Sequence, residues 1–125
     1  QSQAEARGKN RPILLLTAAF IALGGCRRDG QDCPYTGVHR VRVAEAHERG
    51  RRVEITWTSF GQAKNAAFFA AEPRQARLID ELVALRAELG ADGIALDVEE
   101  IADRDIPAYG AFMERLRTAL RADEP

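Results

Sequence analysis

The stretch from Ala91 to Glu100 constrains the fold of this chain more than any other. Ile94, Leu96 and Val98 alternate there with small and acidic residues, and a period of two is that of a β-strand with two different faces. Helical patterns precede and follow this strand, because apolar residues recur in both flanks at spacings of three and four. The resulting α-β-α order predicts an α/β protein with a parallel sheet.

Two acidic residues close the predicted strand. Asp97 and Glu99 occupy alternate positions, so we expect their side chains on one face, about 7 Å apart along the strand. The carboxyl ends of the strands are where a β/α barrel carries its catalytic groups. The simpler interpretation is a pair of solvated carboxylates at the point where a strand enters a loop, and the spacing alone leaves both interpretations open.

The residues around this acidic pair carry a family resemblance. The run Asp92-Gly93-Ile94-Ala95-Leu96-Asp97-Val98-Glu99 resembles the DGxDxDxE signature of family 18 glycoside hydrolases, the chitinase-like enzymes, and especially their spore-germination and cell-wall branch. Asp92, Asp97 and Glu99 match the signature, whereas Ala95 stands where the family has Asp or, in that branch, often Asn. The likeness runs roughly from Gly50 to Leu120 and includes Thr58-Ser59-Phe60-Gly61 and Glu72-Pro73-Arg74.

The resemblance implies a fold, a substrate class and three catalytic residues. The fold is a partial (β/α) barrel of the TIM type with about two to three βα units, and the substrate is a carbohydrate polymer containing N-acetylglucosamine, such as chitin or peptidoglycan. Hydrolysis in this family is assisted by the substrate's own N-acetyl group. Glu99 would be the general acid and later the base, Asp97 would orient the N-acetyl group, and Asp92 would support the strand.

The same resemblance implies a substrate-binding segment. Ser59, Phe60 and Gly61 end the preceding strand and would lie beside the acids, with Phe60 better placed for a sugar than Trp57. No cofactor and no metal are implied. Ala95 cannot form the side-chain hydrogen bond that the family uses to set the charge of the inner Asp, so we expect weakened activity.

Size and charge limit the possibilities further. The chain has 125 residues and a formal net charge of −1 at pH 7, which gives no reason to expect a nucleic-acid partner. A complete β/α barrel takes ~250 residues, with about 200 as the usual minimum. The chain begins at Gln1 and stops at Pro125, just after a predicted helix, and we expect it to be a fragment of a larger barrel.

Residues 1–26 have the pattern of a bacterial export signal. Basic residues precede an apolar run from Pro12 to Leu23, which is too short for a membrane-spanning helix of about 20 residues and suits the apolar part of a signal or an anchor helix. Leu23-Gly24-Gly25-Cys26 resembles a lipobox, which implies cleavage before Cys26 and lipidation of that residue. An ordinary signal peptide, or a buried helix with a chance cysteine, is the alternative.

Polar residues over 27–38 predict a linker, followed by the barrel-like domain over 39–125. The protein would be exported and held at the membrane by a lipid anchor, or secreted. A Cys26–Cys33 disulfide is the alternative to lipidation. Neither cysteine has histidine partners close enough in the sequence to predict a metal site.

The remaining elements follow from periodicity and from Gly and Pro positions. We predict helices over His39–Arg49, from Pro73 to Leu89 and from Pro107 onward, and a strand over Val53–Phe60. Gly61 to Ala71 is expected to be a loop with at most one helical turn. His39 and His47 are expected to be surface or packing residues.

Three functional hypotheses remain open from the sequence. The first is an envelope-anchored hydrolase of N-acetylglucosamine-containing glycans, which the intact pair Asp97 and Glu99 favours. The second is a non-catalytic lipoprotein that binds such glycans on a degenerate barrel, which Ala95 and the short chain favour. The third is an unrelated α/β protein with a chance match to the signature.

Overall fold

The computed structural model describes Ile13–Thr17 and residues 34–124, with side chains from Arg40 onward. Its strands are β1 (Ile13–Thr17), β2 (Arg52–Phe60) and β3 (Gly93–Glu99), which form one parallel sheet in the order β1-β2-β3. The helices are α3 (Pro34–Glu48), α4 (Gln62–Phe69), α5 (Glu72–Leu89) and α6 (Ile106–Ala122), with a short 3-10 helix η1 (Asp103–Asp105). The fold is therefore α/β, as the sequence predicted.

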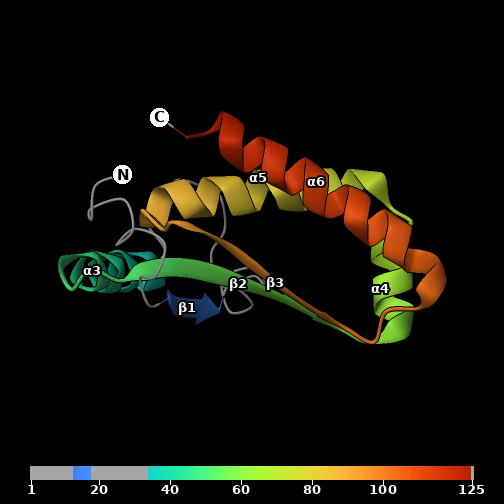
Figure 1. Ribbon diagram of the computed structural model, residues 1–125, viewed down its shortest axis with the longest axis horizontal. Coiled ribbons are helices and arrows are strands. Elements are labelled where there is room, and N and C mark those ends of the chain that lie inside the picture. Colours follow the sequence, from blue (N-terminus) through green and yellow to red (C-terminus); the bar gives the residue numbers. More distant parts are fainter. Residues whose placement is uncertain (1–12, 18–33, 125) are drawn as a thin grey trace, which may run out of the picture.

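The helices sit at defined places around the sheet (Figure 1). Helices α5 and α6 pack on each other and run along β2 and β3, whereas α3 lies near the start of β2. Helix α4 stands at the opposite end, where β2 and β3 finish, and contacts both α6 and η1. The carboxyl ends of β2 and β3 are thus framed by α4 and η1.

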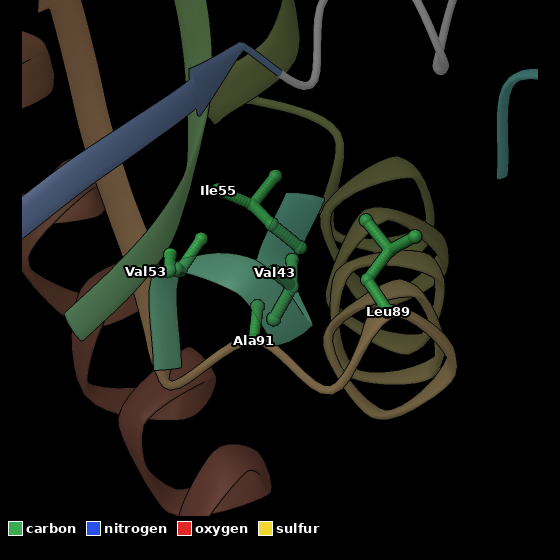
Figure 2. Close-up of a cluster of buried hydrophobic side chains, with 6 residues drawn as sticks. Val43, Val53, Ile55, Leu89 and Ala91 are labelled. Carbon is green, nitrogen blue, oxygen red and sulfur yellow. The ribbon is translucent and has the colours of Figure 1, made fainter. Parts of the chain in front are cut away.

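A first apolar core joins α3 to the sheet. Val43 of α3, Val53 and Ile55 of β2, and Leu89 and Ala91 around the end of α5 are all buried, and they point toward one another in Figure 2. The β2 members lie at alternate positions, as the period of two predicted. This cluster fixes α3 and the end of α5 on the same face of the sheet.

A second core, which contains a group of aromatic side chains, lies under α4, α5 and α6. Phe112 is fully buried, and its ring centroid lies 5.5 Å from that of Phe68 and 6.1 Å from that of Trp57. The alternating residues Ile94, Leu96 and Val98 of β3 pack against this cluster. The prediction that Trp57 belongs to the core is confirmed.

The other face of the sheet contributes to neither core. Its residues on β2 and β3, given by alternation and register, are Glu54, Thr56, Thr58, Phe60, Gly93, Ala95, Asp97 and Glu99. All of them are half-buried or exposed. This face, which includes both acids of the predicted pair, is the one that no described helix covers.

The predicted helices over 73–89 and from Pro107 are confirmed as α5 and α6. Pro73 stands in the first turn of α5, and Gly90 ends that helix in the left-handed conformation, with φ 70°, which glycine adopts without steric cost. The stripe of α6 is buried at Phe112 and Leu116, but Met113 is 40% exposed. Met113 faces the free edge of β3, where no further strand is described.

The anchor helix expected within residues 1–26 is wrong for the described part of that segment. Ile13–Thr17 forms β1, paired in parallel with β2 so that Leu14 lies opposite Val53 and Leu16 opposite Ile55. An apolar run of this length serves a strand as well as a short helix, and the free edge of β2 decides between them by offering backbone hydrogen bonds. The remaining residues of the predicted signal lie outside the described residues.

Two boundaries also differ from the prediction. Helix α3 starts at Pro34, inside the predicted linker 27–38, and Pro is well suited to a first helical turn. The predicted loop after Gly61 is instead the helix α4. Its sequence shows little periodicity because it buries a polar residue, Asn65, alongside Phe69. Among the described residues, no helix has the length and apolar character needed to cross a membrane.

Candidate functional site

The acidic pair lies on the uncovered face, at the carboxyl end of β3. In the parallel register, Thr58 of β2 stands opposite Asp97, and Phe60 stands opposite Glu99. Neighbouring strands lie about 4.8 Å apart, so these residues form one surface. The prediction that Asp97 and Glu99 share a face is confirmed by their alternate positions in an unbroken strand.

Phe60 and Gly61 belong to this surface or border it. Phe60 is 49% exposed, a large fraction for an aromatic side chain, and Glu99 beside it is also exposed. Gly61 has φ 107° and turns the chain from β2 directly into α4. A side chain here would be strained, so glycine is needed for the sharp turn. An exposed ring beside a carboxylate is an arrangement that can hold a sugar by its apolar face and its hydroxyl groups.

Ser59 occupies a different place from the other predicted binding residues. It is only 3% exposed and lies on the helix-covered face, opposite Val98. Its hydroxyl donates a 2.6 Å hydrogen bond to Oδ1 of Asn65. The structure therefore brings Ser59 into contact with α4 and separates it from the surface that carries Asp97.

Asn65 is a residue of the site that the sequence analysis missed. It is fully buried, and its Nδ2 donates a 2.6 Å hydrogen bond to the backbone oxygen of Glu99. One side chain thus joins the end of β2, through Ser59, to the end of β3. The available signal was an Asn among small and apolar residues just after a strand, because such an amide is usually buried only with partners.

The chain turns sharply after Glu99. Glu100 has φ 61°, and it is the one non-glycine residue with positive φ in the described part of the chain. This left-handed conformation is uncommon for residues with a side chain and costs of order 1 kcal/mol or more. The turn directs the chain away from the sheet toward η1.

Thr56 and Ala95 face each other in the middle of the same surface. The Thr56 hydroxyl is buried and has no hydrogen-bond partner among the described residues. Ala95 offers no polar group to it. The position at which this chain departs from the family 18 signature is therefore next to an unpaired buried hydroxyl.

Asp92 lies at the other end of β3, away from Asp97 and Glu99. Its Oδ2 accepts hydrogen bonds from the backbone N–H of Val53, at 2.7 Å, and stands 2.8 Å from Nε2 of His47. Burial works to raise the pKa of Asp92, but the Val53 N–H, His47 and Arg52 outweigh it and hold that pKa below its ordinary value of 3.8. Asp92 therefore binds β2 and α3 through its side chain and does not lie beside the other two acids.

Tyr109 of α6 is electrostatically linked to the site. Burial raises the pKa of Tyr109 above its ordinary value of 10.0, and the negative charge of Asp97 raises it further. Its ring centroid lies 5.3 Å from that of Phe69. The phenol therefore stays protonated at neutral pH and remains a hydrogen-bond donor in the neighbourhood of Asp97.

The described residues contain no group of three or more His, Cys, Asp or Glu side chains placed to hold a metal ion. Cys26, predicted to be lipidated, and Cys33 lie outside the described residues. Comparison of the chain with known protein families, with curated proteins and with solved structures finds no match.

Proposed function

We propose that this chain carries the acid pair of a glycoside hydrolase that cleaves N-acetylglucosamine-containing glycans, chitin or peptidoglycan, with assistance from the substrate. The observation that supports this most directly is the placement of Asp97 and Glu99 on one face at the carboxyl end of a parallel strand. Thr58 and Phe60 adjoin them on β2. This combination of an acidic pair, a hydroxyl and an exposed ring suits the binding and hydrolysis of a sugar chain.

In the proposed mechanism each carboxylate has a separate task. Glu99 gives its proton to the glycosidic oxygen while the substrate's N-acetyl oxygen attacks the anomeric carbon, so the old glycosidic bond breaks as the new C–O bond forms. Asp97 holds the N-acetyl N–H and stabilises the positive charge of the resulting oxazolinium. Glu99, now a carboxylate, takes a proton from water, and the attack of that water on the anomeric carbon restores the N-acetyl group with retained configuration.

The finer architecture that we propose is a segment of a (β/α) barrel of the TIM type. Parallel strands in sequential order with helices on one face are the repeating unit of such a barrel. A groove of about 520 Å³ runs beside the free edge of β3, with Ile94 and Leu96 on one side and Tyr109, Met113 and Leu120 of α6 on the other. Charged side chains, among them Arg86 and Arg117, line the groove together with these apolar ones. A groove of this mixed character beside the open edge of a strand is suited to receive another parallel strand.

We also retain the proposal of an exported lipoprotein anchored through Cys26, or secreted. It rests on the sequence pattern of residues 1–26. Peptidoglycan and chitin lie outside the cytoplasmic membrane, so a lipid-anchored or secreted enzyme meets its substrate there.

A glycan-binding protein without catalysis is the second candidate, and Ala95 favours it. The exposed position of Glu99 favours it as well, because hydrolytic sites usually exclude bulk water from the reacting groups. Phe60 and Asp97 would hold a sugar in either case. Both candidate proteins would therefore bind the glycan, and only the hydrolase would cleave it.

The test measures release of a fluorophore from an N-acetylglucosamine oligomer glycoside by the 125-residue chain. We expect Glu99→Gln to abolish turnover and Asp97→Asn to lower it by at least about 100-fold, the usual contribution of a general acid or base. Glu48→Gln, an exposed acid-to-amide change on α3, is the matched control and should leave turnover unchanged.

Binding of the unlabelled oligomer is measured in parallel by calorimetry. Oligomer binding without turnover in a folded chain would replace the hydrolase with the glycan-binding protein. Absence of both turnover and binding, with circular dichroism showing a folded chain, would reject both candidates.

A further inference from the structure

We propose that Asn65 is a positioning residue that holds the general acid Glu99 at the carboxyl end of β3. The inference rests on the proposed hydrolase function and adds to it a residue that touches neither the substrate nor the reacting atoms. Its basis is a buried hydrogen-bond chain from Ser59 through Asn65 to the Glu99 backbone, followed directly by the strained turn at Glu100.

The two hydrogen bonds of Asn65 fix the orientation of its amide. The Glu99 backbone oxygen can only accept, so it must face Nδ2, which lies within hydrogen-bond distance of it at 2.6 Å. Oδ1 then faces the Ser59 hydroxyl, which can donate to it at 2.6 Å. Since Asn65 is fully buried, loss of either partner leaves a polar group unpaired in the interior, which destabilises the folded chain.

The backbone of α4 places Asn65 where it can reach both strands. The Asn65 N–H donates to the Gly61 oxygen at 2.9 Å, in the first turn of α4. Gly61 in turn follows β2 directly, so the side chain is carried by the same connection that ends the strand. The hydrogen-bond chain Ser59–Asn65–Glu99, called the clamp below, is therefore attached to β2 through both the main chain and Ser59.

The clamp accounts for the conformation at Glu100. The hydrogen bond to the Glu99 oxygen fixes the peptide plane between Glu99 and Glu100, and the chain leaves that plane in the left-handed region at φ 61°. Such a strained residue persists only where its surroundings determine it. Without the Asn65 amide this strand end can relax, and the backbone from which the exposed Glu99 side chain projects is then no longer held in place.

A small displacement of a catalytic group has a large effect on rate, about 100-fold for an error of ~1 Å. We therefore expect Asn65→Leu, which is nearly isosteric and cannot donate at any pH, to lower kcat by about 100-fold with little change in KM. Asn65→Asp should behave differently at different pH. Its neutral carboxyl can still donate to the Glu99 oxygen, whereas its ionised form cannot, so its defect should grow as the pH rises.

The structural readout is independent of activity. In NMR spectra, the nuclear Overhauser effect between the amide and α protons of Glu100 is strong when φ is positive, because the two protons are then close together. We expect a strong signal in the unaltered chain and a weakened one in Asn65→Leu. Gln62→Glu, an exposed amide-to-acid change on the same helix, is the control and should keep the signal strong. Ser59→Ala, which leaves the bond to Glu99 in place, should have an intermediate effect.

The outcomes separate this inference from the proposed function. An unchanged Glu100 signal in Asn65→Leu would overturn the clamp, and a weakened signal with unchanged kcat would overturn its role in positioning Glu99. If the unaltered chain turns over no substrate, the hydrolase proposal fails and the catalytic role of Asn65 fails with it. The NMR comparison still decides in that case whether the clamp exists. If Asn65→Leu does not fold, the pH dependence of the signal in Asn65→Asp provides the same decision.

Discussion

Nε2 of His47 lies 2.8 Å from Oδ2 of Asp92, and this contact joins α3 to the start of β3. The same Asp92 oxygen accepts the Val53 N–H, and the Asp92 N–H donates to the Val53 oxygen at 2.8 Å. Asp92 therefore links three elements at the end of the sheet opposite the acid pair. In this structure it is a fold-supporting residue.

Asp92 should make the stability of the chain depend on acidic pH. Its pKa is lowered in the folded state, so the stability that it contributes is fully present above the ordinary pKa of 3.8 that applies to the unfolded chain. That contribution is lost as the pH falls through the folded pKa. We expect Asp92→Asn to lower the free energy of unfolding by about 1 kcal/mol at neutral pH and to flatten the acid limb of the stability curve.

Urea denaturation from pH 2 to pH 7 measures this effect. Asp80→Asn, an exposed change of the same kind on α5, is the control and should leave the curve as it is. An acid limb of equal slope in Asp92→Asn and the unaltered chain would contradict the assignment.

Ala95→Asn should satisfy the unpaired Thr56 hydroxyl. The two residues are opposite each other in the parallel register, and the Thr56 oxygen is buried without a partner among the described residues. One added hydrogen bond is worth about 0.5–1.5 kcal/mol, so we expect a gain in stability of that order in thermal or urea unfolding. If the chain is a hydrolase, turnover should rise as well.

The matched control for this change is Ala95→Asn in a Thr56→Val background. There the introduced amide has no hydroxyl to bind, and the stability gain should disappear. A gain of the same size in both backgrounds would show that the Thr56 hydroxyl is not the partner.

Phe112 should dominate the stability of the aromatic core. It is fully buried against Trp57, Phe68 and Phe69, and removing such a ring costs about 3–5 kcal/mol. We expect Phe112→Ala to approach complete unfolding, and Phe112→Leu to lower the urea midpoint measurably. Met113→Ala, at the adjacent but 40% exposed position, should change stability by less than about 1 kcal/mol. Similar losses at both positions would contradict the assigned orientation of α6.

The predicted lipoprotein signal implies that β1 is absent from the mature protein. Cleavage before Cys26 would remove Ile13–Thr17 and leave the edge of β2 that pairs with β1 without a partner strand. We expect mass spectrometry of the chain exported from a bacterial host to show a lipidated amino terminus at Cys26, and Cys26→Ser to abolish the lipid. A mature protein that retains Ile13 would instead show that β1 belongs to the folded domain and that the signal is not cleaved before Cys26.

The spacing of apolar residues and the positions of Gly and Pro were sufficient to predict much of the fold. The period of two in β2 and β3, the stripe of α5 and the glycine at its end each predicted an element that the structure confirms. These signals are local, because each element shows its own buried face in the spacing of its apolar residues. The shared face of Asp97 and Glu99 was predictable for the same reason.

The contacts of single polar residues were not predictable in this way. Helix α4 was expected to be a loop. One of its buried positions is occupied by the polar Asn65, so the apolar periodicity that usually indicates a helix is weak there. The expected anchor helix contains β1, because pairing with β2 overrides an apolar pattern that suits either conformation. His47 was expected to be a surface or packing residue and is exposed, but its contact with Asp92, 45 residues away in the sequence, was not foreseen.

The sequence by itself determined the α/β class, the face on which the two acids lie and the ends of the strands that carry them, because these follow from short-range periodicity. Tertiary structure alone decided which residues support that site. It separated Asp92 from the acid pair, buried Ser59 on the covered face and brought Asn65 to the Glu99 backbone. The physical reason is that hydrogen bonds between distant residues depend on how helices pack on the sheet, and no local spacing in the chain encodes that packing.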